Sequence, residues 1–367
     1  MKDFIPQIEP WIDESELVQL KRVIKNTYVT EHELTKEFET LIQDLTNSTY
    51  AISITNGTAA LFCCLKALDI GEGDEVIVPN ITFIASANAV IMANATPVVC
   101  EIDSENFCID IDKIESLITK RTKAIMPVHL YGQSSNMEAI VNIADKYNIK
   151  VIEDAAQGVG VRYNTQHVGT FGDMGILSFY GNKTITCGEG GVVLTNSKYL
   201  RDRVYRLKNH GRLLKGRFKH EEIGFNFSFT EMQAAIGISQ LHKLSRIIEK
   251  KQQIYNRYHI AFQNLKGIVD RVYVSDRCQP VWWFTSILVE QKIELQKYLL
   301  EKGIQTRDFF YPLHRQPCYV NEKVQFSKAG YVVSDNVYSK AISLPSSYGL
   351  TNRQQDYIIS NIINFYQ

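Results

Sequence analysis

The sequence lacks an excess of charge of either sign. It has 40 lysine and arginine residues against 40 aspartate and glutamate residues, so its formal net charge is zero. Proteins that attract nucleic acids or anionic membranes through their overall charge carry a basic excess, and we therefore expect neither partner. A long hydrophobic run is also missing, since no segment approaches the roughly 20 apolar residues that a membrane-spanning helix needs.

The sequence also lacks the pattern of a secretory signal and the cysteine spacings of zinc sites or disulfide frameworks. The start, Met1-Lys2-Asp3-Phe4-Ile5-Pro6, shows no basic end followed by an apolar core, which is the mark of a secretory signal. The seven cysteines are scattered apart from the adjacent Cys63 and Cys64, and they form neither a zinc spacing nor a disulfide framework. We therefore expect reduced, buried thiols, no metal site and a cytoplasmic location.

The order of the predicted elements indicates an α/β protein. Short apolar strands alternate with helical stretches, which predicts a large domain with a mainly parallel sheet covered by helices. Two helical patterns open this domain, the first beginning at Asp13 and Glu16 and the second at Thr30 and Glu33. The predicted strands of this domain are 51–55, 75–79, 97–101, 123–128, 150–154, 175–179 and 191–195.

The rest of the chain predicts a smaller α+β domain. A long helical pattern over about 230–265 leads out of the first domain. Strands 283–289 and 304–310 and helices 294–302 and 352–365 follow. With 367 residues the chain is long enough for two domains, and we place them at 1–240 and 241–367.

Lys183 and Asp154 point to a reaction class. Lys183 stands in the run Ser178-Phe179-Tyr180-Gly181-Asn182-Lys183-Thr184 behind a predicted strand, and Asp154 closes an apolar strand upstream. Pyridoxal 5'-phosphate (PLP) chemistry needs a lysine for a Schiff base and an acid for the pyridinium nitrogen. Taken alone, Asp154 is as well explained as the cap of the next helix, and Gln157 as a solvated loop amide. Lys183 and Asp154 together indicate PLP chemistry more specifically than either residue does alone.

Phosphate-binding candidates lie at other strand ends. Asn56-Gly57-Thr58 joins a strand to a helix, so the amides of Gly57 and Thr58 would point from a helix N-terminus at an anion. Ser178 offers a hydroxyl to the same phosphate, and Phe83 offers a flat face to a cofactor ring. The alternatives are an ordinary Asn-Gly turn and a core phenylalanine.

Two nucleotide-binding motifs are excluded. Asn182-Lys183-Thr184 ends like a P-loop, but that motif requires glycine where Asn182 and Leu177 stand. Gly158-Val159-Gly160 lacks the third glycine of a dinucleotide fingerprint. The basic stretch 201–220 either contacts a diphosphate or is a solvated helix and loop.

Five motifs resemble the DegT/DnrJ-type PLP-dependent sugar aminotransferases of fold type I, and the likeness covers nearly the whole chain. They are Asn56-Gly57-Thr58, Gly73-Asp74-Glu75-Val76-Ile77-Val78-Pro79, Pro127-Val128-His129-Leu130-Tyr131-Gly132, Glu153-Asp154-Ala155-Ala156-Gln157, and the segment from Ser178 to Gly191. Within the family, Gly181-Asn182-Lys183-Thr184-Ile185-Thr186 looks most like the GDP-perosamine synthases, which aminate a 4-keto-6-deoxy sugar on a nucleotide. The segment 306–314 is similar to the same group.

The resemblance implies a role for each candidate residue. Lys183 would be the catalytic residue, which bonds PLP and later moves a proton between cofactor and substrate. The other cofactor-binding residues would be Asp154 at the pyridine nitrogen, Gln157 at the ring oxygen, Phe83 on the ring, and Gly57, Thr58 and Ser178 at the phosphate. Asn226 would reach that phosphate from a neighbouring subunit. His314 and Tyr311 would bind the substrate.

The implied activity is transfer of an amino group from glutamate to C4 of a nucleotide-linked keto sugar, for O-antigen or similar surface polysaccharides. The implied assembly is a homodimer with shared active sites, in which the aromatic loop Phe225-Asn226-Phe227-Ser228-Phe229 meets the partner. Two positions depart from the pattern: Ser228 stands where the family often has arginine, and Gln157 where perosamine synthases usually have an acid. Amination at C3 is an alternative. Dehydratases of this fold replace the lysine with histidine, and a non-catalytic regulator could lose Lys183 or Asp154, whereas this chain keeps both.

Overall fold

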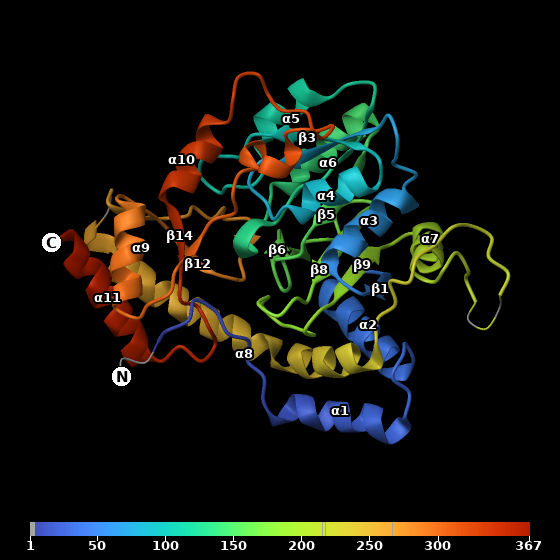
Figure 1. The fold of residues 1–367 in the computed structure, drawn as a ribbon, viewed down its shortest axis with the longest axis horizontal. Helices are drawn as coiled ribbons and strands as arrows, with labels where there is room; N and C mark the ends of the chain where they lie inside the picture. Colours follow the sequence, from blue (N-terminus) through green and yellow to red (C-terminus); the bar gives the residue numbers. More distant parts are fainter. Residues whose placement is uncertain (1–3, 215, 217, 266) are drawn as a thin grey trace.

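A seven-stranded sheet forms the centre of the large domain (Figure 1). The computed structural model describes residues 4–214, 216, 218–265 and 267–367. The strand order is β1-β9-β8-β5-β4-β2-β3. The strands are β1 (Tyr50–Ile54), β2 (Glu75–Pro79), β3 (Thr96–Cys100), β4 (Thr122–Ile125), β5 (Lys150–Asp154), β8 (Met174–Ser178) and β9 (Gly191–Thr195).

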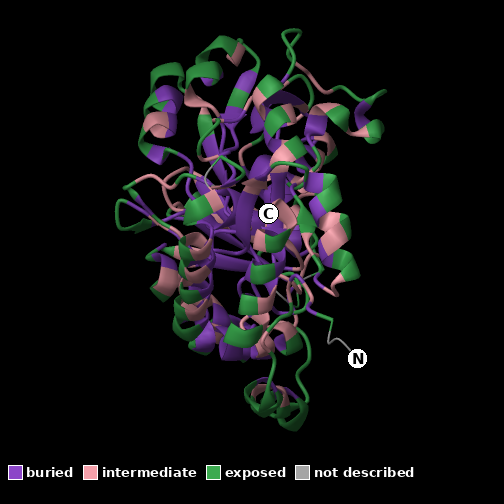
Figure 2. Cartoon of the chain, turned by 90° about the vertical axis from the view of Figure 1, so that its left-hand side faces the viewer, coloured by how far each residue is buried: buried purple, intermediate pink, exposed green. Residues whose placement is uncertain are grey.

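Most neighbours in this sheet are parallel. The pairs β2–β3, β2–β4, β4–β5 and β5–β8 are parallel, and β9 is antiparallel to both β8 and β1. Parallel sheets are covered on both faces, so their strands are apolar throughout; Val76, Ile77 and Val78 accordingly have no exposed surface. Figure 2 shows the strands as the buried centre of the molecule.

Helices cover the two faces of the sheet and form two cores. One core is built with α3 (Gly57–Ala67), α4 (Ala85–Met92) and α7 (Lys198–Lys208). The other is built with α2 (Glu33–Thr46), α5 (Ile111–Leu117), α6 (Met137–Tyr147) and the first half of α8 (Glu231–Ala261). A small sheet of β11 (Cys278–Gln279), β6 (Arg162–Tyr163) and β7 (Gln166–His167) lies beside them.

The C-terminal region forms a second, smaller unit around a sheet in the order β10-β12-β14-β13. Its strands are β10 (Val269–Arg271), β12 (Thr285–Val289), β13 (Arg307–Asp308) and β14 (Ala341–Leu344), and its helices are α9 (Lys292–Glu301), α10 (Val332–Lys340) and α11 (Asn352–Tyr366). Short 3₁₀ turns occupy Leu130–Gly132, Gln263–Leu265, Leu313–Arg315 and Pro317–Tyr319. The second half of α8 packs on this unit through Ile254 and Tyr258, so one helix joins both cores (Figure 1).

The predicted fold class is confirmed, with corrections in detail. The predicted strand 304–310 is wrong in extent: only Arg307 and Asp308 pair with β14, and Phe310 instead donates its backbone N–H to the Tyr131 hydroxyl. The predicted domain boundary falls inside α8 and stays a prediction.

The caps of the first two helices differ from each other. Asp13 and Glu16 form the expected capping box of α1 (Glu14–Asn26). Helix α2, in contrast, begins after His32 rather than after Thr30, and no side chain caps it locally. The carboxylate of Glu231, at the start of α8, instead accepts the amides of Leu34 and Thr35 at 2.8 Å. A neighbouring helix therefore satisfies amides that local capping leaves open.

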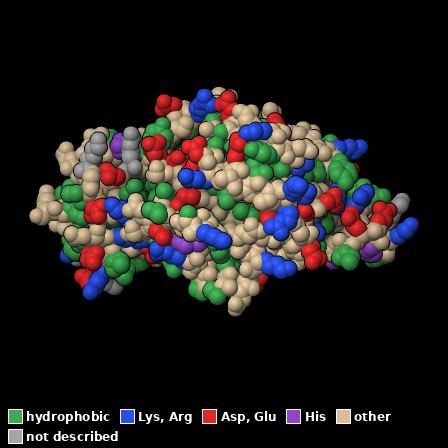
Figure 3. Space-filling view, turned by 90° about the horizontal axis from the view of Figure 1, so that it is seen from above, with side chains coloured by type: hydrophobic (Ala, Val, Ile, Leu, Met, Phe, Trp, Pro, Cys, Tyr) green, Lys and Arg blue, Asp and Glu red, His purple; other side chains and the backbone are tan. Residues whose placement is uncertain are grey.

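The surface carries both signs of charge close together. Figure 3 shows lysine and arginine side chains interspersed with aspartate and glutamate over the visible face. In the basic stretch 201–220, α7 ends at Lys208, Arg203 pairs with Asp69 at 2.6 Å, and residues 215 and 217 lie outside the described residues. Within the described part of the chain, no helix combines the length and the apolar character needed to cross a membrane.

Candidate active site

The candidate residues gather at one edge of the large sheet. Because β1 and β8 both run antiparallel to β9, the carboxyl ends of β1 and β8 lie at the same edge as those of β5 and β2. Asp154 closes β5, Ser178 closes β8, and Gly57 begins the helix that follows β1. This edge is where open α/β sheets bind their ligands.

Asp154 is a buried carboxylate with two fixed oxygens. One oxygen accepts the Ser86 hydroxyl at 2.7 Å, and the other accepts the backbone N–H of Ala156 at 3.1 Å. Asp154 is 5% exposed and Ser86 is fully buried. These two hydrogen bonds hold both oxygens in place, so Asp154 offers a carboxylate of fixed orientation at the edge of the sheet.

Lys183 lies in the loop after β8 against an aromatic face. Its ammonium nitrogen is 4.0 Å from the ring centroid of Trp283, and the Trp283 indole N–H donates to the Asn182 carbonyl at 2.6 Å. Burial lowers the pKa of Lys183 from 10.5 to about 8, against the opposing effect of Asp154 and with a smaller contribution from Arg307. A neutral amine is therefore accessible near physiological pH, as a nucleophilic lysine requires.

The start of α3 leaves two backbone amides without a partner in the helix. The Asn56 side chain caps the Ala59 amide at 2.9 Å, and the Ala60 amide bonds to the Asn56 carbonyl. This leaves the amides of Gly57 and Thr58 pointing from the helix N-terminus, where the helix dipole favours an anion. A Cβ at Gly57 would lie 3.1 Å from Cβ of Ser178. The three predicted phosphate ligands therefore share one cradle, and the lack of a side chain at Gly57 keeps it open.

Gln157 is oriented by the backbone of Tyr131. The Tyr131 N–H donates to the Gln157 side-chain oxygen at 2.6 Å. Because a backbone N–H can only donate, the Gln157 amide group is fixed with its oxygen toward Tyr131, which leaves its NH₂ group as the donor. A carboxylate at this position could accept the same N–H but could offer no such donor.

His314 docks on the residue that follows β2. Asn80 accepts the His314 backbone N–H at 3.1 Å, and its side-chain nitrogen lies 2.8 Å from Nδ1 of His314. Nδ1 also lies 3.2 Å from the Asn80 side-chain oxygen, and Nε2 lies 3.2 Å from Asp335. Burial lowers the pKa of His314, although Asp335 opposes the shift. Tyr311, three residues earlier, is 40% exposed and packs edge-on against Tyr338.

Phe83 stands at the rim with its ring free on one side. It is 53% exposed, and its carbonyl lies 3.3 Å from the Ser86 hydroxyl that bonds Asp154. Its ring centroid is 5.8 Å from that of Phe310, which in turn stacks on Tyr131 at 5.1 Å. An aromatic wall from both units of the fold thus borders the edge that holds Asp154.

Asn226 is exposed in the loop before α8. The next residue, Phe227, accepts the Thr55 amide at 3.1 Å, so the loop runs beside the end of β1. The phenylalanines of this loop pack within their own chain, because Phe225 and Phe227 both contact Phe62 edge-on and Phe229 is fully buried. The expectation that these rings lie against a partner is therefore not supported. The exposed apolar residues nearby are instead Phe218 and Ile223, each 86% exposed.

Sequence reasoning missed Ser86, Trp283 and Tyr131. Ser86 follows Phe83 at helical spacing, and that spacing would have placed it near the same edge. Nothing in the sequence around Lys183 indicates that Trp283 lies beside it, because Trp283 belongs to the distant segment before β12. Gly132, with φ 89°, lets that segment pass, since a side chain there would collide with the Val281 backbone. Tyr131 itself has φ 51°, a conformation that is uncommon for residues other than glycine.

These residues fit PLP. The chain offers a fixed carboxylate for a pyridinium nitrogen, an NH₂ donor for a ring oxygen, two helix amides and a hydroxyl for a phosphate, and an amine of lowered pKa. Asp154 acts on the pKa of that amine, Lys183, by raising it against the effect of burial.

Comparison with known proteins gives one consistent result. A family model described as the DegT/DnrJ/EryC1/StrS aminotransferase family matches residues 10–363. The chain is 39% identical over 367 residues to the GDP-perosamine synthase of Escherichia coli O157:H7, with 99% of each chain covered. It is 35% identical over 369 residues to the GDP-perosamine synthase of Vibrio cholerae, again with 99% of each covered. The X-ray structure of S. venezuelae DesV in complex with a ketimine intermediate superposes with a TM-score of 0.93 at 29% identity, covering 100% of this chain and 99% of that one.

Proposed function

Because the chain belongs to the DegT/DnrJ/EryC1/StrS aminotransferase family and is a PLP-dependent sugar aminotransferase, we propose that it aminates a nucleotide-linked 4-keto-6-deoxy sugar at C4. Glutamate is the proposed amino donor, and a surface polysaccharide such as O-antigen is the proposed destination of the product. The observation that carries the chemistry is Lys183, an amine of lowered pKa near the buried charge of Asp154. The near full-length likeness to two GDP-perosamine synthases supports the substrate.

In the proposed mechanism, PLP supplies the electron sink that stabilises negative charge on a substrate carbon. Asp154 would keep the pyridine nitrogen protonated, because a negative charge beside a base favours its protonated form. Lys183 would hold the cofactor and would move a proton between donor and acceptor carbons, a task that suits an amine whose pKa lies near the working pH. Burial is the cause of that pKa.

The remaining candidate residues bind and orient. Gly57, Thr58 and Ser178 would hold the phosphate, the NH₂ group of Gln157 would donate to the ring oxygen, and Phe83 would stack on the ring. Their common place at the carboxyl edge supports these roles. His314 and Tyr311 would face the sugar nucleotide.

The first test is the identity of the bonded lysine. Borohydride reduction followed by peptide mapping should place the cofactor on Lys183, and Lys183→Ala should lose the label and the activity together. Lys251→Met is the matched control, since burial also lowers the pKa of Lys251, to about 7. This variant should keep the label. A label on Lys251 would contradict the assignment.

The second test is the position of amination. A panel of 3-keto and 4-keto sugars linked to GDP, dTDP or UDP, with glutamate as donor, should give product with the 4-keto sugars. Product from a 3-keto sugar alone would make the enzyme a 3-aminotransferase and leave the PLP chemistry intact.

We further propose a homodimer in which Asn226 reaches the phosphate of the partner's cofactor. The support is the exposure of Asn226 and of the apolar side chains of Phe218 and Ile223, since exposed apolar groups mark interfaces. A mixture of Lys183→Ala and Asn226→Asp chains tests it. Shared sites would leave one intact site in each heterodimer and restore activity, whereas separate sites would restore none after proven exchange.

A cytoplasmic location belongs to the same proposal. All seven cysteines are free, and six of them are buried. Free thiols are typical of proteins from reducing compartments.

A further inference from the structure

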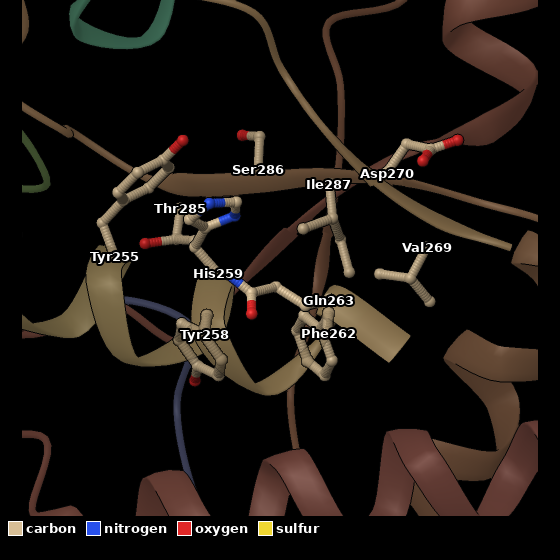
Figure 4. A pocket seen from close by; sticks show the side chains of 10 residues that line it. All are labelled: Tyr255, Tyr258, His259, Phe262, Gln263, Val269, Asp270, Thr285, Ser286 and Ile287. Carbon is tan, nitrogen blue, oxygen red and sulfur yellow. The ribbon is translucent and has the colours of Figure 1, made fainter. Parts of the chain in front are cut away.

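A cavity of about 240 Å³ lies in the C-terminal unit, between the last turns of α8 and strands β10 and β12. Figure 4 shows the side chains of Tyr255 and His259 rising from α8 toward the strand that carries Thr285, Ser286 and Ile287, whereas the rings of Tyr258 and Phe262 point away from that strand. None of the residues placed at the catalytic edge lines this cavity. It is therefore a separate space, and the proposed aminotransferase reaction gives it no role.

One face of α8 forms the aromatic wall of the cavity. Tyr255, Tyr258, His259 and Phe262 are spaced three and four residues apart and all line it, as neighbours on one helical face do. The rings lie nearly parallel in pairs: Tyr258 and Phe262 at 15°, and Tyr255 and His259 at 19°. The Tyr258 hydroxyl donates to the Pro345 carbonyl at 3.1 Å, so it is not the polar group offered to a ligand. Tyr255 also stacks on Trp282, with ring centroids 3.7 Å apart and planes at 7°, and aromatic surroundings of this kind favour a flat ring as the occupant.

Thr285 supplies an unused polar group to the cavity. Its side chain is 2% exposed, and its hydroxyl has no hydrogen-bond partner among the described residues. Its backbone amide, in contrast, is bonded to Ser346 at 2.9 Å. An unpaired buried hydroxyl is destabilising, so a hydroxyl kept beside an open cavity points to a partner that arrives with a ligand.

The charge of the described lining residues disfavours an anionic ligand. None of the described residues that line the cavity is a lysine or an arginine, and Asp270 contributes a carboxylate. Asp270 accepts the Gly267 amide at 3.0 Å with one oxygen, and the other oxygen can accept a further N–H. Phosphate groups are thereby disfavoured, and N–H donors are favoured.

We propose that this cavity binds an uncharged planar heterocycle with N–H donors, of the nucleobase or nucleoside class. The ring would stack along the α8 wall, and its polar groups would meet Thr285 and Asp270. The volume lies just below the range of about 300–1,000 Å³ found for drug-sized ligands, which fits a molecule of one or two rings.

Calorimetric titration of the full-length, PLP-loaded protein with guanosine and thymidine tests the proposal. Thr285→Val removes the hydroxyl at nearly constant volume, and Asp270→Asn keeps an acceptor for Gly267. Each should weaken nucleoside binding at least tenfold, while glucose and inorganic phosphate should not bind at this site. Because the catalytic site is proposed to take a nucleotide sugar, nucleoside binding that is equal in the wild type and both variants would place it there and overturn the proposal. No nucleoside binding to the wild type, or glucose binding that both variants abolish, would also overturn it.

Thermal unfolding without ligand gives an independent readout. Thr195→Val is the matched control, because Thr195 is also a buried strand threonine but donates to the Asp173 carbonyl at 3.0 Å. Thr285→Val should raise the melting temperature, and Thr195→Val should lower it. Equal destabilisation by both changes would mean that the Thr285 hydroxyl already has a partner, which would remove the basis for a ligand.

Discussion

Asp154→Asn is expected to abolish transamination without disturbing the fold. The asparagine oxygen can still accept the Ala156 amide, as one Asp154 oxygen does at 3.1 Å. The new NH₂ group would face Ser86, whose hydroxyl now donates at 2.7 Å and can rotate to accept instead. The local hydrogen bonds therefore survive, and the change removes only the negative charge.

The size of the loss follows from the burial of that charge. At a hydrogen-bond distance of about 2.8 Å and an effective dielectric constant of about 20, two unit charges interact by about 6 kcal/mol. Asp154 is only 5% exposed, so water screens little of this interaction. A loss of about 4–6 kcal/mol lowers the turnover rate by about three to four orders of magnitude.

The assay is the single-turnover reaction with glutamate, followed by the cofactor's absorbance. Ser86→Ala is the matched control, because it removes one hydrogen bond from Asp154 and keeps the charge, so its loss should be about tenfold. A second readout is the pKa of Lys183 in the protein without cofactor, which should fall below about 8, since Asp154 raises it. If a folded Asp154→Asn protein retained more than about a tenth of the wild-type turnover, Asp154 would be a capping residue and the reasoning would be wrong.

Three further changes test the fold around the site. Gly57→Ala should weaken PLP binding about tenfold in a fluorescence titration, because its Cβ would press on Ser178, whereas Gly71→Ala meets only ordinary contacts of 3.6 Å and should have no effect. Glu231→Gln should lower the free energy of unfolding in urea by about 2–4 kcal/mol, because it sets an NH₂ group against backbone donors of α2 that the carboxylate now accepts. Burial lowers the pKa of Lys251 from 10.5 to about 7. Between these two pH values the Lys251 amine is therefore protonated in the unfolded chain and neutral in the folded chain. The stability of the wild type relative to Lys251→Met should therefore rise with pH from 7 to 10, by at most about 1.4 kcal/mol per unit, and a fall would contradict the burial of the amine.

The local parts of the fold and site were predictable from sequence, and the contacts between distant segments were not. The strands of the large sheet were located to within a few residues, because strands buried on both faces are continuous apolar runs. Asp154 and Ser178 were found because each closes such a run. The short strands β10, β11 and β14 were missed, since elements of two to four residues carry no periodicity. The cap of α2 was missed because its acceptor, Glu231, lies far along the chain.

Trp283 shows why the environment of Lys183, the proposed catalytic lysine, depends on both units of the fold. Its ring faces Lys183 at 4.0 Å, although it belongs to the segment that leads into β12. Its carbonyl accepts the buried Lys251 amine of α8 at 2.9 Å, and the same amine lies 3.3 Å from the Ser346 carbonyl. Helix α8 packs on the large sheet through Ile238 and on the smaller unit through Ile254. The position of the ring beneath Lys183 is therefore fixed by a helix shared between the two cores, and the reactivity of that lysine is a property of the assembled chain rather than of the motif that contains it.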